Sequence, residues 1–155
     1  EDYTYFIKGL KCEKGGLGVG AYVYYRRVVE NQKNRLLGEI LRVAKKVQAR
    51  PDQITAIENA ISETQFAKAV DTVKGMLPES LLIDGHNPLK LMHKALSIAL
   101  HNESDEKCLA LAHDIRVVLT DLSERMKMVL SEQRELKNAV SSLMKFNREA
   151  NDAAR

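Results

Sequence analysis

The sequence predicts an all-α fold: an antiparallel up-and-down four-helix bundle with a long projecting C-terminal helix. Residues 104–147 carry mostly apolar side chains at alternating steps of four and three residues, a period that only a helix has. Three shorter segments with helical spacing precede it and are joined by short connectors, which favours helices that run up and down beside one another. The 155 residues are enough for one domain with its own hydrophobic core.

The composition is that of a globular protein, and no membrane span is expected. Hydrophobic residues make up 45% of the chain and charged residues 29%, and no apolar run approaches the ~18 residues of a membrane helix. The 24 basic and 21 acidic residues leave a net charge of only +3, so affinity for nucleic acid would need a local basic patch. Cys12 and Cys108 lie far apart in the sequence, which fits a reducing compartment, and we expect a cytoplasmic protein. No motif requires a cofactor.

Residues 1–20 form the first predicted unit, an N-terminal arm followed by a glycine-rich loop. The arm is expected to be a short strand or a packed segment because it begins with aromatic and apolar residues: Tyr3, Tyr5, Phe6 and Ile7. Four of the six residues 15–20 are glycines, and such a loop before a helix can hold a phosphate on its backbone N–H groups. The spacing matches neither Gly-x-Gly-x-x-Gly nor a loop ending in Gly-Lys-Ser/Thr, so a flexible entry loop is favoured over a nucleotide site.

The predicted bundle spans residues 21–128 and begins with three helices. The first covers residues 21–47 and ends before Pro51, because the residue that precedes a proline is pushed out of helical geometry. The second covers residues 52–77 and ends at a glycine and a proline. The third covers residues 88–100 and has a proline in its first turn. A backbone N–H at that position has no acceptor within the helix, so the proline costs no hydrogen bond there.

The last predicted helix begins near Ser104, whose side chain can cap it, and is roughly 65 Å long, about twice the size of a small domain. Residues 129–155 are therefore expected to extend beyond the bundle as an assembly surface. The predicted interface residues follow the heptad spacing: Val129, Leu136, Val140 and Leu143. The helix positions beside these residues are apolar too, so the apolar stripe is wider than a two-stranded zipper needs. We therefore expect a homodimer or contact with a missing part of the same protein. The alternative is a frayed or bent tail after Met128.

Two arginines near the start of the bundle are candidates for contact with phosphate. Arg26 and Arg27 lie in an otherwise apolar stretch, and Arg26 is four residues before Glu30, so these two can pair on one helix face. A structural ion pair is the favoured interpretation, and contact with a phosphate or an RNA backbone is the alternative.

His101 is the candidate for acid–base chemistry. It stands at the end of the third predicted helix, where a histidine can act as a general acid or base, but where capping of the last carbonyl groups is more common. The other histidines and Cys108 recur at spacings of seven or eight residues, unlike the short ligand pairs of zinc sites, so no metal site is expected.

Three stretches, residues 18–30 (GVGAYVYYRRVVE), 87–91 (NPLKL) and 96–109 (LSIALHNESDEKCL), resemble a bacterial domain of unknown function in the HEPN superfamily. The resemblance covers roughly residues 17–122. It implies a helical bundle, commonly dimeric, of the kind found in bacterial toxin–antitoxin, phage-defence and RNA-processing systems. Catalytic members are metal-independent ribonucleases with an Arg-x4-6-His motif. His101 matches the histidine of that motif, but Lys94 stands where the arginine would be, and a lysine lacks the planar fork that grips a phosphate.

The sequence thus favours a non-enzymatic helical module for dimerisation and interaction. We expect it to belong to a larger bacterial protein that is connected with defence or nucleic-acid systems, and RNA is one partner that this interpretation allows. We expect a further N-terminal region because the chain begins at Glu1 without a methionine. The first alternative is a HEPN-type ribonuclease that uses His101 and Lys94. The second is a nucleotide-binding module built on the glycine-rich loop.

Overall fold

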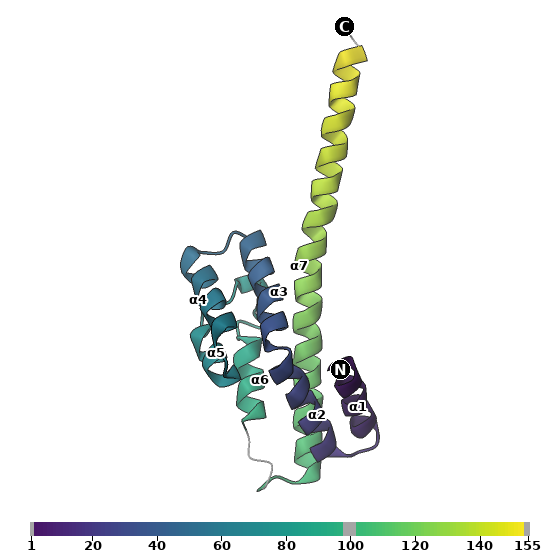
Figure 1. Ribbon diagram of the computed structural model, residues 1–155. Coiled ribbons are helices and arrows are strands. Elements are labelled where there is room, and N and C mark those ends of the chain that lie inside the picture. The colour runs from purple at the N-terminus through teal and green to yellow at the C-terminus, as the bar shows by residue number, and fades with distance from the viewer. Residues whose placement is uncertain (1, 98–101, 154–155) are drawn as a thin grey trace.

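The protein is all-helical, as the computed structural model in Figure 1 shows for residues 2–97 and 102–153. Seven α-helices and one short 3-10 helix make up the described part of the chain. The expected long C-terminal helix is confirmed: α7 (Asp105–Ala153) is continuous over 49 residues and rises past all the other helices in Figure 1. The four-helix count is not confirmed, because two of the expected helices are each divided and the N-terminal arm is itself a helix.

The N-terminal arm is α1 (Asp2–Lys14), so of the two expected forms the short strand is wrong and the packed segment is confirmed. It forms a hairpin with α2 (Gly18–Asn31), and the turn is a Schellman motif in which Leu17 N–H donates to the Cys12 carbonyl and Gly16 N–H to the Glu13 carbonyl. Gly16 has φ +71°, a conformation that glycine adopts without strain. The glycine-rich stretch therefore serves as a tight helix-to-helix turn.

The predicted helix over residues 21–47 is divided at Gln32, between α2 and α3 (Lys33–Lys46). Lys33, the first residue after the break, is buried and its Nζ donates to the carbonyls of Ala60, Ile61 and Glu63. These carbonyls lie at the C-terminal end of α4, where a lysine can satisfy groups that the helix leaves unpaired. The division at Gln32 thus coincides with a contact that ties α3 to the end of α4.

The predicted helix over residues 52–77 is also divided, into α4 (Pro51–Ser62) and α5 (Phe66–Thr72). Glu63 has extended backbone angles, and its carboxylate accepts the N–H groups of Thr64 and Gln65. Because this side chain offers the backbone a local alternative to the helical ladder, the chain turns here.

The remaining elements lead from α5 to α7. A single 3-10 turn, η1 (Glu79–Leu81), precedes α6 (Pro88–Leu96), and the Asn87 side chain caps α6 by accepting the N–H groups of Leu89 and Lys90. The expected third helix over residues 88–100 is confirmed in its position and in its N-terminal proline, but α6 ends at Leu96 with Ser97 as its C-cap, earlier than expected. The last residues of the expected helix, 98–100, and His101 lie outside the described residues.

The core forms around the first half of α7. Ser104 caps this helix, since its Oγ accepts the N–H of Lys107, as expected from the sequence. The face of α7 toward the core consists of fully or nearly fully buried residues: Cys108, Ala112, Ile115, Leu122 and Met126. In Figure 1 α1 lies on one side of this half of α7, and α4, α5 and α6 lie on the other. The heptad prediction is thus confirmed over the part of the helix that is inside the body.

Gly18 allows α2 to touch α7. A Cβ atom at Gly18 would lie 1.9 Å from the Asp105 carbonyl oxygen and 2.6 Å from the Leu109 nitrogen. The N–H groups of Gly18 and Val19 donate to the Asp105 carboxylate over 2.9 and 2.8 Å. The start of α7 and the start of α2 are therefore in backbone contact, and any side chain would force them apart.

We expect Gly18→Ala to lower the free energy of unfolding by about 2 kcal/mol or more, because backbone atoms cannot move aside as a flexible side chain can. Gly38→Ala is the matched control: it lies within α3 and no atom would come within 4 Å of its new Cβ. The control should be neutral or stabilise by about 0.5–1 kcal/mol through helix propensity. Urea unfolding of both variants measures the difference, and equal effects would refute the proposed role of Gly18.

Candidate functional site

The second half of α7 presents an apolar stripe that nothing in the described chain covers. Leu136 is 65% exposed, Val140 46%, Leu143 64% and Phe146 67%. Val129, the first of the four predicted interface residues, is half-buried and packs against the core instead. The helix continues to Ala153, so the alternative of a bent or frayed tail after Met128 is not what the structure shows.

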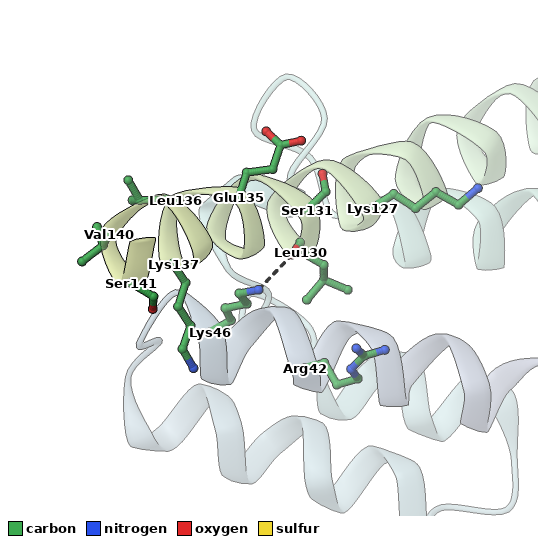
Figure 2. Close-up of a pocket in the computed structure, with 10 residues that line it drawn as sticks. All are labelled: Arg42, Lys46, Lys127, Leu130, Ser131, Glu135, Leu136, Lys137, Val140 and Ser141. Atoms are coloured by element: carbon green, nitrogen blue, oxygen red, sulfur yellow. Dashed lines mark hydrogen bonds between the residues drawn. The ribbon is translucent and has the colours of Figure 1, made fainter. Parts of the chain in front are cut away.

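A groove lies where α7 leaves the body, between the end of α3 and the projecting helix (Figure 2). We call it the helix-exit groove, and it has a volume of about 960 Å³. Its lining is Arg42 and Lys46 from α3, with Lys127, Leu130, Ser131, Glu135, Leu136, Lys137, Val140 and Ser141 from α7. Lys46 Nζ donates to the Leu130 carbonyl over 2.9 Å, so the two helices are pinned together at the base of the groove.

The helix-exit groove combines basic and apolar groups. Four of its lining residues are cations, namely Arg42, Lys46, Lys127 and Lys137, against one carboxylate, Glu135. Its apolar groups, Leu130, Leu136 and Val140, continue into the exposed stripe of α7. An elongated amphipathic segment with acidic side chains has the shape and charge that suit such a groove better than a compact small molecule does.

Glu13 is the centre of the most extensive polar cluster. Its carboxylate accepts from the Tyr25 hydroxyl over 2.7 Å and from Arg116 Nε and Nη2 over 2.7 and 2.8 Å, and His113 Nδ1 lies 2.9 Å away. The hydrogen bonds from Arg116, Tyr25 and His113 outweigh burial and lower the pKa of Glu13 from 4.5 to about 2. Burial, and next the bond to Glu13, raise the pKa of the Tyr25 hydroxyl.

This cluster joins three helices, because Glu13 is on α1, Tyr25 on α2, and His113 and Arg116 on α7. Its members satisfy one another, and the described structure places no nucleophile or second carboxylate among them. The cluster is therefore a structural clamp that fixes α1 to the core. The sequence offers no local signal for it, since Glu13 and Arg116 are 103 residues apart.

The two candidate arginines are used differently. Arg26 pairs with Glu30 over 2.9 Å, which confirms the expected ion pair. Arg27 instead lies over the Tyr5 ring of α1, with its guanidinium carbon 5.6 Å from the ring centre. The two side chains therefore do not form one phosphate-binding pair.

Arg26 does lie near the end of α6. It shares a hollow of about 580 Å³ with Glu30, Lys33, His93 and Ser97, among other residues. Lys94 is exposed on α6 and is not among the residues that line this hollow. His101 falls outside the described residues, so its distance from Arg26 and Lys94 stays a prediction.

The glycine-rich loop already uses, within the fold, two of the backbone N–H groups that could bind an anion. The N–H groups of Gly18 and Val19, the first donors of α2, already bind the Asp105 carboxylate. These two hydrogen bonds lower the pKa of Asp105. A phosphate at this helix end would have to displace a carboxylate that the fold itself supplies.

Residues 2–97 and 102–153 bring together no group of three or more histidine, cysteine or acidic side chains that could hold a metal ion. Within the same residues, no helix has the length and apolar character needed to cross a membrane.

Comparison with known proteins gives no match: the chain resembles no family model, no curated protein and no solved structure closely enough to count.

The Glu13 clamp predicts a specific pH dependence of stability. A carboxylate whose pKa is lowered to about 2 in the folded protein stabilises the fold above the unfolded value of 4.5, and this contribution disappears as the pH falls through about 2. The difference corresponds to about 3 kcal/mol at neutral pH. We expect Glu13→Gln to remove most of it and to flatten the dependence of unfolding free energy on pH between 4.5 and 2.

Glu58→Gln is the control for this experiment, because Glu58 forms an exposed ion pair with Lys45 and should change stability by less than about 1 kcal/mol. Denaturant unfolding at a series of pH values provides the comparison. A Glu13→Gln variant as stable at pH 7 as the Glu58→Gln control would contradict the assignment of Glu13 as a clamp.

Proposed function

We propose that this chain is a non-enzymatic helical assembly module of a larger bacterial, cytoplasmic protein, and that it forms a homodimer through residues 129–153 of α7. The observation that carries the proposal is a continuous helix whose second half exposes a large apolar stripe. Exposed apolar surface of this extent on a soluble protein marks an interaction site.

The length of the projection supports the proposal. Residues 131–153 extend roughly 34 Å of helix beyond the body. A helix of this kind in water has marginal stability by itself, and helices in proteins are stabilised chiefly by packing of an apolar face. A partner that covers the stripe therefore supplies the stabilisation that the body cannot.

The area of the stripe is sufficient for a specific interface. Its described members are large and at least 46% exposed: Leu136, Val140, Leu143, Met144 and Phe146. If each side chain contributes on the order of 100 Å², two copies remove on the order of 1,000 Å² from water, which reaches the lower limit of a biological interface. Because a second copy carries the same stripe, two copies can cover each other's stripes without a different partner protein.

The width of the stripe bears on the type of assembly. Met144 and Phe146 flank the heptad core and are 55% and 67% exposed, whereas a simple zipper places charges at such positions. Flanks of this kind leave apolar surface beside the seam of a helix pair, where a second dimer or another part of the same protein can pack in addition.

We expect the wild-type chain to sediment as a dimer at tens of micromolar and Leu143→Glu to sediment as a monomer, because a carboxylate in the interface stays unpaired and loses its water. Ser142→Glu is the matched control, since Ser142 is the exposed polar neighbour on the same helix. Helix content by circular dichroism verifies that the body is folded in both. A monomeric wild-type chain, or equal behaviour of the two variants, would sink the proposal.

The second candidate function is a HEPN-type, metal-independent ribonuclease. It is supported by the sequence resemblance and by the position of Arg26 in a hollow that reaches His93 and Ser97 at the end of α6, shortly before His101 in the chain. In that case Arg26 and Lys94 would steady the phosphate and His101 would transfer the proton. Association with RNA or a defence system belongs to this candidate as well. A nucleotide-binding module has less support, because Asp105 occupies the start of α2.

On the leading proposal, purified protein leaves both structured and single-stranded RNA intact. Gel analysis over hours, without divalent metal, tests this. RNA cleavage by the wild-type chain that is lost in His101→Ala, with Arg27→Ala as the control arginine outside the hollow, would establish the ribonuclease in its place.

A further inference from the structure

The exposed stripe of α7 lies on the same side of the helix as the body. The buried residues Leu122 and Met126 and the exposed residues Leu136 and Val140 belong to one heptad series, which drifts by only ~20° per heptad on a straight helix. Leu136 and Val140 also share the helix-exit groove with Arg42 and Lys46 of α3. The stripe thus stands directly above the end of α3.

This placement prevents two copies from pairing in parallel. A helix packed on the stripe lies about 8–10 Å from α7, on the side of α3. In a parallel pair the partner helix would continue past Leu130 into the space of α3, and each body would collide with the other in the same way. In an antiparallel pair only the C-terminal end of the partner helix approaches α3.

The distribution of apolar residues gives the register. The exposed members run from Leu136 to Phe146, and their centre is between residues 141 and 142. A two-fold axis at that point sets Val140 against Leu143 of the other copy, a pairing of a with d positions that antiparallel helices require. The same register brings residues 152–153 of one copy level with Leu130 and Ser131 of the other.

That level is the helix-exit groove, and its charge complements the helix end that would arrive there. Residues 149–153 contain two carboxylates, Glu149 and Asp152, and are flanked by Arg155 and by Arg148, which this register sets level with Glu135 of the other copy's groove. The groove presents Arg42, Lys46 and Lys127. Such complementarity selects the orientation of a helix pair as well as stabilising it.

We propose that two copies pair antiparallel through their projecting helices, and that the C-terminal end of each α7 is seated in the helix-exit groove of the other copy. The two bodies then lie at opposite ends of the pair. This inference rests on the proposed homodimer and assigns its orientation, its register and the occupant of the groove.

Spin labels on α7 separate the possible outcomes. A label at Glu124, an exposed position on the helix, lies about 52 Å along the axis from its counterpart in the antiparallel pair, whereas a parallel pair leaves them within about 20 Å. A label at Ser142, next to the two-fold axis, gives a short distance in either arrangement. Cys12 and Cys108 are replaced by serine and alanine, and circular dichroism verifies the fold.

A short distance at residue 142 together with about 50 Å at residue 124 supports the proposal. Short distances at both positions overturn the antiparallel arrangement but leave the homodimer intact. No intermolecular distance at either position, at tens of micromolar, overturns the homodimer itself.

A charge exchange tests the groove. Lys127→Glu should raise the dimer dissociation constant about threefold to tenfold, as should Asp152→Lys, and the two changes combined should restore it because the pair is reformed with opposite signs. Lys90→Glu, on the exposed surface of α6, is the control and should have no effect. If Lys127→Glu strengthens the dimer, or if the combined variant is weaker than either single one, the carboxyl-bearing helix end does not occupy the groove.

Discussion

One continuous helix, α7, is longer than the body whose core it completes. The first half of α7 supplies a face of the core through Cys108, Ile115 and Leu122. Its second half continues the same stripe where no helix of the described chain can cover it. The residues of α7 that pack in the core and those that form the exposed stripe thus belong to one heptad pattern.

Three sets of contacts fix the direction of this helix. At its start, the close approach of Gly18 to the backbone of Asp105 and the bonds to the Asp105 carboxylate hold α2 against α7. About three turns further on, Arg116 binds Glu13 and draws α1 into the same assembly. Near the exit, Lys46 binds the Leu130 carbonyl. Anchored along its length in this way, α7 has a defined orientation when it leaves the body, which is what an assembly surface on a helix requires.

The sequence was informative wherever a single local pattern determined the structure. Heptad spacing predicted the length of α7, its buried face and its exposed stripe, and the proline and capping residues predicted the starts of α6 and α7. The divisions at Gln32 and Glu63 were missed because the apolar spacing continues through both, and the contacts of Lys33 with the end of α4 depend on tertiary structure. Glu13 and Arg116 meet only in the folded chain. Of the candidate site, the stripe was predictable, whereas the helix-exit groove was not, because α3 and α7 form it together.

In the proposed dimer, the stripe on the second half of α7 is covered by another copy. Hydrogen exchange of the amides of residues 136–146, measured over a range of protein concentrations, tests it most directly, because an uncovered helix opens locally far more often than a packed one. We expect the protection of these amides to rise with protein concentration, while that of residues 108–126 stays constant. Rapid exchange of residues 136–146 at every concentration up to hundreds of micromolar would contradict it.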